Sequence, residues 1–122
     1  MMLTEIKRGE IWLIKYKKSD SLGTEIYKTR PAIIFSTDFY NQKSKRIIAL
    51  PLTSTIRPLY PWEISVTVNN KKGKIMVDQI RSFDKEQRLV KKLGSLSNEI
   101  MERAEKILAK LVALKFLSKV KL

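Results

Sequence analysis

The chain of 122 residues contains no cysteine and no histidine. Without cysteine it can form no disulfide, offers no thiolate to zinc and has no thiol nucleophile. Without histidine it lacks the usual acid–base residue, Ser-His-Asp triads and histidine metal sites. The sequence also has no apolar run near the roughly 18 residues of a membrane span. Any catalysis must therefore depend on other side chains.

Acidic residues are scarce, with 12 Asp and Glu against 25 Lys and Arg, a net charge of +13 and a pI of about 10.1. The positive excess is spread along the chain, so it belongs to the folded body and not to a tail. A basic body favours a polyanionic partner, because Lys and Arg contacts to phosphate release counterions. A proteome rich in lysine is the ordinary alternative explanation of this composition.

Glycine and proline are also few, at four each, and they form no linker between segments. Repeats and low-complexity tracts are absent, while the hydrophobic content of 43% is ordinary for a globular protein. The length and composition predict one domain over residues 1–122. The first residues lack the apolar stretch of a signal peptide, so the expected location is the cytoplasm.

Short segments rich in β-branched and aromatic residues predict strands separated by polar turns. Pro31 is expected to open the second strand, and Pro51 indicates a bulge or an edge position in the third. In the fourth strand, alternation places Trp62 on the core face and Glu63 on the solvent face. The predicted strands are residues 10–16, 32–36, 46–52, 62–68, 74–81 and 88–93.

Ser97 is expected to cap an amphipathic helix over residues 98–117, whose apolar positions recur every three or four residues. Shorter turns or helical pieces are expected at residues 39–43, 69–73 and 83–86, and polar loops at 17–25 and 53–61. The order of elements predicts an α+β, mainly β fold. Its core is a small antiparallel barrel with the C-terminal helix packed against it.

Several sequence motifs occur in collinear order and together resemble the MazF/PemK family of toxin endoribonucleases. They are RGEIW at 8–12, GTEIYKTRPAII at 23–34, PLTS at 51–54, DQIR with DK at 78–85, and KLGSLS with ME at 92–102. One departure is Thr37, where many members of this family have asparagine. A hydroxyl can serve the same turn-capping role. The resemblance implies an SH3-like barrel shared by the CcdB, MazF and PemK toxins.

The resemblance implies cleavage of single-stranded RNA by the ribose 2′-OH, without metal or cofactor. The products are a 2′,3′-cyclic phosphate and a 5′-OH. In this interpretation the planar guanidinium of Arg30 binds phosphate oxygens, the Thr53 hydroxyl hydrogen-bonds the phosphate or the 2′-OH, and Glu25 accepts the 2′-OH proton. The structural alternatives are a surface arginine, a threonine bonded to local backbone, and a solvated carboxylate paired with Lys28.

Further residues near the polar loops are candidates for RNA binding. Lys28 lies two residues from Arg30 and can contact the same strand of RNA. Tyr27 and Tyr60 can stack on unpaired bases or pack within the protein. The remaining candidates are Ser54 of the PLTS motif and Gln79, for which a hydrogen bond between strand and loop is the ordinary role.

The resemblance also implies a homodimer and a cognate antitoxin with an acidic, partly disordered segment, and no membrane association. A basic body suits both an acidic partner and an RNA substrate. Two other functions remain open: a CcdB-like non-catalytic toxin that binds gyrase, and a basic nucleic-acid-binding module without activity. The combination of Arg30 and Thr53 argues against a gyrase binder, which does not need these groups.

Overall fold

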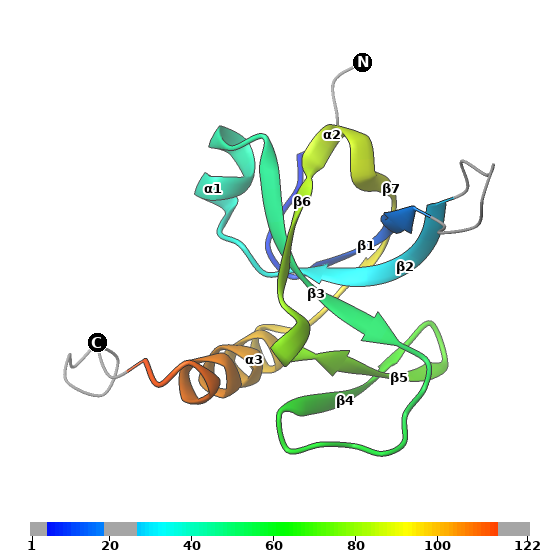
Figure 1. Ribbon diagram of the computed structural model, residues 1–122, viewed down its shortest axis with the longest axis vertical. Helices are drawn as coiled ribbons and strands as arrows, with labels where there is room; N and C mark the ends of the chain where they lie inside the picture. Colours follow the sequence, from blue (N-terminus) through cyan, green and yellow to red (C-terminus); the bar gives the residue numbers. More distant parts are fainter. Residues whose placement is uncertain (1–4, 19–26, 115–122) are drawn as a thin grey trace.

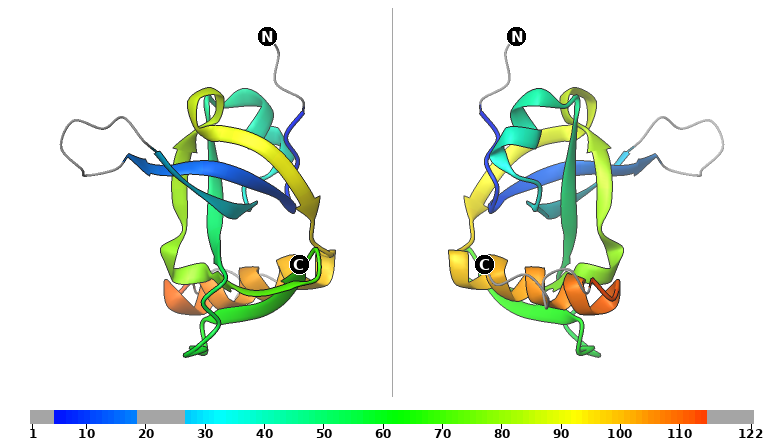
Figure 2. Two further views of the ribbon diagram at one scale, coloured as in Figure 1. Left: turned by 90° about the vertical axis from the view of Figure 1, so that its right-hand side faces the viewer. Right: turned by 90° about the vertical axis from the view of Figure 1, so that its left-hand side faces the viewer.

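A curled antiparallel sheet forms the body of the protein, and one helix lies across one side of it (Figures 1 and 2). The computed structural model describes residues 5–18 and 27–114. The strand order is β4-β5-β3-β2-β1-β7, and β6 also pairs with β3. Within the described part of the chain, no helix is long and apolar enough to cross a membrane.

The strands are β1 (Glu10–Lys18), β2 (Tyr27–Ile34), β3 (Arg46–Thr53), β4 (Glu63–Val68), β5 (Lys71–Met76), β6 (Arg81–Asp84) and β7 (Leu89–Ser95). The helical segments are α1 (Asp38–Lys43), the 3₁₀ turn η1 (Val77–Gln79), α2 (Lys85–Arg88) and α3 (Asn98–Leu111).

The three central strands, β1 to β3, bury side chains on both faces. Alternate residues of these strands enter two separate apolar clusters, as Ile33 and Ile34 of β2 illustrate. One cluster lies between the sheet and the layer of β4, β5 and α3, and the other fills the curl closed by β6 and β7. This double burial explains the apolar runs that these strands contain, which are residues 11–14, 31–34 and 47–52. The prediction of a mainly β barrel with a C-terminal helix is confirmed.

Two prolines lie inside strands, and neither position was predicted correctly. Pro31 lies in the middle of β2, opposite Leu13 of β1, just outside the β2–β3 ladder that begins at Ala32. Pro51 lies in β3, an interior strand, so the predicted edge position is wrong. It stands between the residues that pair with β6 and those that pair with β5. A change of partner is a place where a missing N–H costs little.

The β4–β5 hairpin is tighter than the sequence predicted. Asn69 and Asn70 alone form the turn, with φ of 51° and 65°. Positive φ at both central residues is the backbone of a type I′ hairpin, which asparagine tolerates well. Gly73, expected in the turn, lies inside β5 instead. The core face of β4 is as predicted for Ile64 and Val66, which are buried.

Trp62 was placed incorrectly on that core face. It precedes β4, is only partly buried, and stacks on Tyr60 with ring centroids 5.0 Å apart and planes 3° apart. Glu63, predicted to face solvent, is buried. The single predicted strand 74–81 is divided by η1 into β5 and β6, and β7 continues through Gly94 to Ser95.

The side-chain caps of two helices follow the sequence prediction. Ser97 Oγ accepts the Ile100 N–H at 3.3 Å at the start of α3, and Thr37 Oγ1 accepts the Tyr40 N–H at 3.3 Å at the start of α1. Helix α3 ends at Leu111, earlier than the predicted residue 117. Residues 115–122 lie outside the described part of the chain.

Candidate active site

A shallow hollow opens where β2 and β3 separate. The β2–β3 ladder ends at the pair Ala32 and Pro51, and Arg30 and Thr53 each lie two residues beyond it on their own strands. Side chains two residues apart on a strand point to the same face, so Arg30 and Thr53 continue the face of that last pair. The hollow contains both residues. Its lining is Lys28, Thr29, Arg30, Pro31, Leu52, Thr53, Ser54 and Thr55.

The hollow is cationic and rich in hydroxyl groups. Lys28 and Arg30 are exposed, and no acidic residue lines it within the described chain. Four of the lining residues carry hydroxyls, which can donate hydrogen bonds to an anion. Among the described residues, no group of three or more His, Cys, Asp or Glu side chains could hold a metal ion. The arrangement suits a phosphate bound through side-chain donors.

Thr53 is the last residue of β3, and its hydroxyl is oriented by the chain that follows. Thr53 Oγ1 accepts the Thr55 N–H at 3.2 Å. The hydrogen bond between threonine and local backbone, which the sequence analysis named as the alternative role of Thr53, is therefore present. It uses only one acceptor position of the hydroxyl. Because a hydroxyl also carries one donor hydrogen, Thr53 can still donate to a phosphate oxygen.

The carbonyl of Thr53 is packed directly against Gly73 of β5. A Cβ added at Gly73 would lie 2.8 Å from Thr53 O, closer than such atoms approach in proteins. Thr53 pairs with Lys74 in the β3–β5 ladder, so the close approach belongs to the sheet itself. Gly73 is thus required for the position of Thr53, although the sequence suggested only a turn residue.

We expect Gly73→Ala to displace Thr53 and to lower stability by about 1–3 kcal/mol through overpacking. A misplaced catalytic group also slows the reaction, so RNA cleavage should fall by about 10-fold or more. Urea unfolding and a cleavage assay measure the two effects. Gly94→Ala in β7 is the matched control, because a Cβ at Gly94 meets nothing within 4 Å. Equal behaviour of the two variants would contradict the prediction.

A buried ion pair holds the loop that follows Thr53. Lys74 Nζ lies 2.8 Å from Glu63 Oε1, and both side chains are more than nine-tenths buried. Lys74 also donates to the carbonyl of Pro58, and Glu63 Oε1 accepts the Tyr60 N–H at 3.0 Å. The pair therefore ties residues 58 and 60 to the β4–β5 hairpin. The sequence analysis missed it, because alternation assigned Glu63 to the solvent face.

The pair shifts the titration of its carboxyl. Burial by itself raises the pKa of Glu63. The hydrogen bond from Lys74, the hydrogen bond from the Tyr60 N–H and the positive charge of Lys74 lower it by more than burial raises it, so the pKa of Glu63 lies below the ordinary 4.5. Glu10 behaves alike: burial raises its pKa, while hydrogen bonds from Lys7 N–H, the Trp12 indole and Lys92 bring it below 4.5.

A carboxyl with a lowered folded-state pKa binds protons more weakly in the folded than in the unfolded chain. Its contribution to stability is complete above the unfolded-state pKa and is lost as the pH falls through the folded-state pKa. We therefore expect the free energy of unfolding to decrease from about pH 6 to about pH 3. Urea unfolding across this range tests the slope, which should be shallower in Glu63→Gln and unchanged in Glu102→Gln, an exposed position.

The other predicted site residues divide into three groups. Lys28 and Ser54 line the hollow. Tyr60 is 45% exposed and lies in the loop that Glu63 and Lys74 hold, but it does not line the hollow. Gln79 lies in η1, which packs against α3, and Gln79 does not line the hollow either. Tyr27 is the first residue of β2, and Glu25 lies outside the described residues.

The chain is similar in sequence and in fold to known proteins. The family model described as "PemK-like, MazF-like toxin of type II toxin-antitoxin system" matches residues 7–112. The chain therefore belongs to this family of toxins. It is 31% identical over 101 residues to endoribonuclease MazF9 of Mycobacterium tuberculosis, covering 75% of this chain and 83% of the relative.

A second sequence relative and a solved structure are also similar to this chain. The chain is 27% identical over 108 residues to endoribonuclease EndoA of Bacillus subtilis, covering 84% of this chain and 90% of the relative. Among solved structures, a mycobacterial endoribonuclease in complex with its cognate antitoxin matches with a TM-score of 0.71 and 24% identity. This match covers 89% of the chain and 96% of the solved one. The structural match supports the fold.

Proposed function

We propose that this chain is the toxin of a type II toxin–antitoxin system and an endoribonuclease that cleaves single-stranded RNA. The observation that supports the proposal is the hollow that Arg30 of β2 and Thr53 of β3 both line. The relatives named as endoribonucleases support the activity. Cleavage of mRNA by such an enzyme stops translation.

The proposed reaction is an in-line attack within the RNA itself. The ribose 2′-oxygen forms a bond to the adjacent phosphorus, and the bond from phosphorus to the 5′-oxygen of the next nucleotide breaks. The 2′-OH proton passes to a base, for which Glu25 is our candidate, and the leaving oxygen takes up a proton. The products are a 2′,3′-cyclic phosphate and a 5′-OH, with no metal or other cofactor.

Arg30 and Thr53 have separate parts in this proposal. Negative charge grows on the non-bridging phosphate oxygens in the transition state, and the fork of Arg30 can bind two of them. Thr53 donates a hydrogen bond to the same phosphate or to the attacking oxygen. Lys28 holds a neighbouring phosphate, and Ser54 adds a donor at the rim of the hollow. Tyr27, Tyr60 and Gln79 are proposed as contacts to the RNA on either side.

The proposed partners follow from the charge. A cognate antitoxin with an acidic segment would compete with RNA for the cationic hollow, and a solved relative is described as bound to its antitoxin. We also propose that the chain forms a homodimer and acts in the bacterial cytoplasm, where its mRNA substrate is.

The test is incubation of the purified protein with a long transcript in EDTA, followed by primer extension. We expect cuts at a limited set of sites, with 2′,3′-cyclic phosphate ends, that disappear in Arg30→Ala and Thr53→Val. RNA that is bound but never cut would instead indicate a nucleic-acid-binding module. Intact RNA together with inhibited gyrase would indicate a CcdB-like toxin. Either result would overturn the proposed function.

A further inference from the structure

The loop of residues 54–62 lies against the outer face of the β4–β5 hairpin. Successive residues of a strand alternate between its two faces, so Glu63 and Lys74 project from the face opposite the apolar core, to which their strand neighbours belong. Both charged side chains are nevertheless more than nine-tenths buried. Ser65, on the same outer face, lines an open groove together with loop residues 56–59. The loop therefore covers this face of the hairpin.

The loop is fixed at two points. Near its start, Thr55 lines the hollow and donates its N–H to the hydroxyl at the end of β3. Further along, Lys74 Nζ donates to the carbonyl of Pro58, and the carboxylate of Glu63 accepts the Tyr60 N–H. Three residues of chain span at most about 11 Å, so Pro58 lies within that distance of Thr55. A shift of the second fixed point is therefore transmitted to the hollow.

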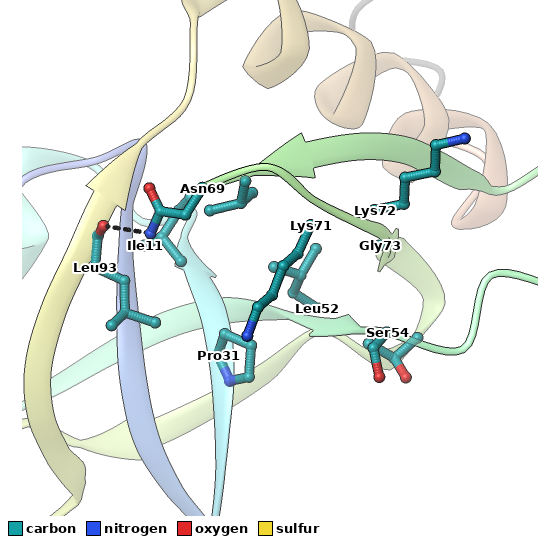
Figure 3. A pocket seen from close by; sticks show the side chains of 11 residues that line it. Ile11, Pro31, Leu52, Ser54, Asn69, Lys71, Lys72, Gly73 and Leu93 are labelled. Carbon is teal, nitrogen blue, oxygen red and sulfur yellow. Dashed lines mark hydrogen bonds between the residues drawn. The ribbon is translucent and has the colours of Figure 1, made fainter.

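The position of Thr53 does not depend on this loop. Thr53 pairs with Lys74 in the β3–β5 ladder, and Gly73 admits its carbonyl at close range. Ser54 lies where the chain leaves β3, and it lines the same pocket as Gly73 (Figure 3). A change in the loop therefore alters the contacts from Ser54 onward and leaves the hydroxyl of Thr53 in place.

The short segment between the two fixed points carries a cation. Arg57 is exposed and lines the open groove, which has no acidic residue in its lining within the described chain. Among the described residues, no acidic side chain forms an ion pair with Arg57. An unpaired guanidinium close to a cationic hollow suits a second phosphate of the same RNA chain.

Stability alone does not require an ion pair beneath the loop. Apolar side chains of similar size commonly replace a buried pair without loss of stability. They cannot, however, donate to the carbonyl of Pro58 or accept the Tyr60 N–H, and a buried backbone group without a partner is costly. An apolar pair would therefore release both backbone groups to water, and the loop with them. What the charged pair adds is its hydrogen bonds to the loop.

We propose that Glu63 and Lys74 are positioning residues for RNA cleavage, which hold the loop in the conformation that receives the substrate. The proposal rests on the proposed function and adds to it two buried residues that RNA does not touch. Because Arg30 and Thr53 are held by their own strands, loss of the pair weakens the binding of RNA more than it slows the chemical step. The effect is measured in KM and in the affinity for RNA.

The first experiment replaces the pair by apolar side chains in the variant Glu63→Leu, Lys74→Met. We expect a folded protein whose KM for a defined RNA rises by about 10-fold, as when one charged hydrogen bond to the substrate is lost, while kcat stays within about threefold. The control variant Glu102→Leu, Lys106→Met makes the same substitutions at exposed positions of α3 and should change neither value. Equal KM in the two variants would overturn the inference and leave the proposed function standing.

The second experiment tests whether the pair acts through the loop. Arg57→Ala should weaken binding of an uncleavable 2′-O-methyl RNA pool by about 10-fold in the parent, but by less than about twofold in the Glu63→Leu, Lys74→Met background, because residues that act through one contact are not additive. The slope of log Kd against log salt should fall by about 0.7 in each variant, the value for one phosphate on a single strand. Additive losses would contradict the inference.

Single substitutions of Glu63 give a check that does not depend on the stability of the double variant. Glu63→Gln removes the charge but keeps an oxygen for the Tyr60 N–H, so the Kd should stay within about threefold of the parent's, whereas Glu63→Leu should raise it. A Kd that follows the charge and not the hydrogen bond would contradict the inference. If the parent binds the RNA pool but never cuts RNA, the proposed function fails and the Kd ratios still decide the inference. If the parent binds no RNA, both are wrong.

Discussion

Arg30→Ala is expected to lower the rate of RNA cleavage by about 10²–10³-fold, the usual loss when one donor to transition-state charge is removed. The side chain is exposed and lies at the edge of the hollow, so the free energy of unfolding should change by less than about 0.5 kcal/mol. Single-turnover cleavage of a defined RNA and urea unfolding measure the two quantities separately.

Two further variants make this prediction specific. Arg30→Lys keeps the charge but loses the planar fork, so it should recover only part of the activity. Arg103→Ala removes the same charge from an exposed position on α3 and should leave the rate within about twofold, because exposed charges act weakly at a distance. A rate in Arg30→Ala equal to that of Arg103→Ala would remove Arg30 from the chemistry.

Lys74→Met is expected to be the most destabilising of the single substitutions, with a loss of about 3–5 kcal/mol. It keeps the long side chain but leaves the Glu63 carboxylate buried without its cation. Domains of this kind are commonly stable by about 5–15 kcal/mol, so the loss is a large part of the total. The midpoint of urea unfolding measures it. Loosening of the loop that Lys74 and Glu63 hold at Pro58 and Tyr60 should accompany the loss. It should appear as faster amide exchange at Leu59, Tyr60 and Trp62.

The double variant Glu63→Leu, Lys74→Met should recover most of this stability, because two apolar side chains can replace a buried pair at little cost. Lys91→Met is the control for removal of one lysine from an exposed strand position, and its stability should stay within about 0.5 kcal/mol of the parent. If Lys74→Met unfolds at the same urea concentration as Lys91→Met, the ion pair does not support the fold.

The sequence predicted the elements of this fold well because their signals are local. Ser97 caps α3 as its hydroxyl and position suggest, and the alternation of Ile64 and Val66 marks the core face of β4. The predicted end of α3 was wrong, because the helix stops at Leu111 although apolar residues continue beyond it in the sequence. The edge position suggested by Pro51 was wrong, because the exchange of partners along β3 is a property of the whole sheet.

The two main site candidates came from separate motifs, and the structure brings Arg30 and Thr53 to one hollow through the register of β2 and β3. The residues that support them were missed. Glu63 and Lys74 are charged, and a pattern analysis assigns charged residues to the surface. The signal was available, however: with a two-residue turn at Asn69 and Asn70, these two residues lie diagonally across one face of the hairpin.

The pairing of β1 with β7 joins the beginning of the described chain to a strand made of Leu89–Ser95. A nascent polypeptide that stops before this point leaves one edge of β1 without a partner and the cluster around Trp12 and Ile14 open to water. Contacts between distant parts of a chain form late, because the intervening loop must close first. Arg30 pairs with Ile14 of β1, and Ile14 in turn pairs with Leu89 of β7, so the strands around this arginine are complete only after β7 has been synthesised.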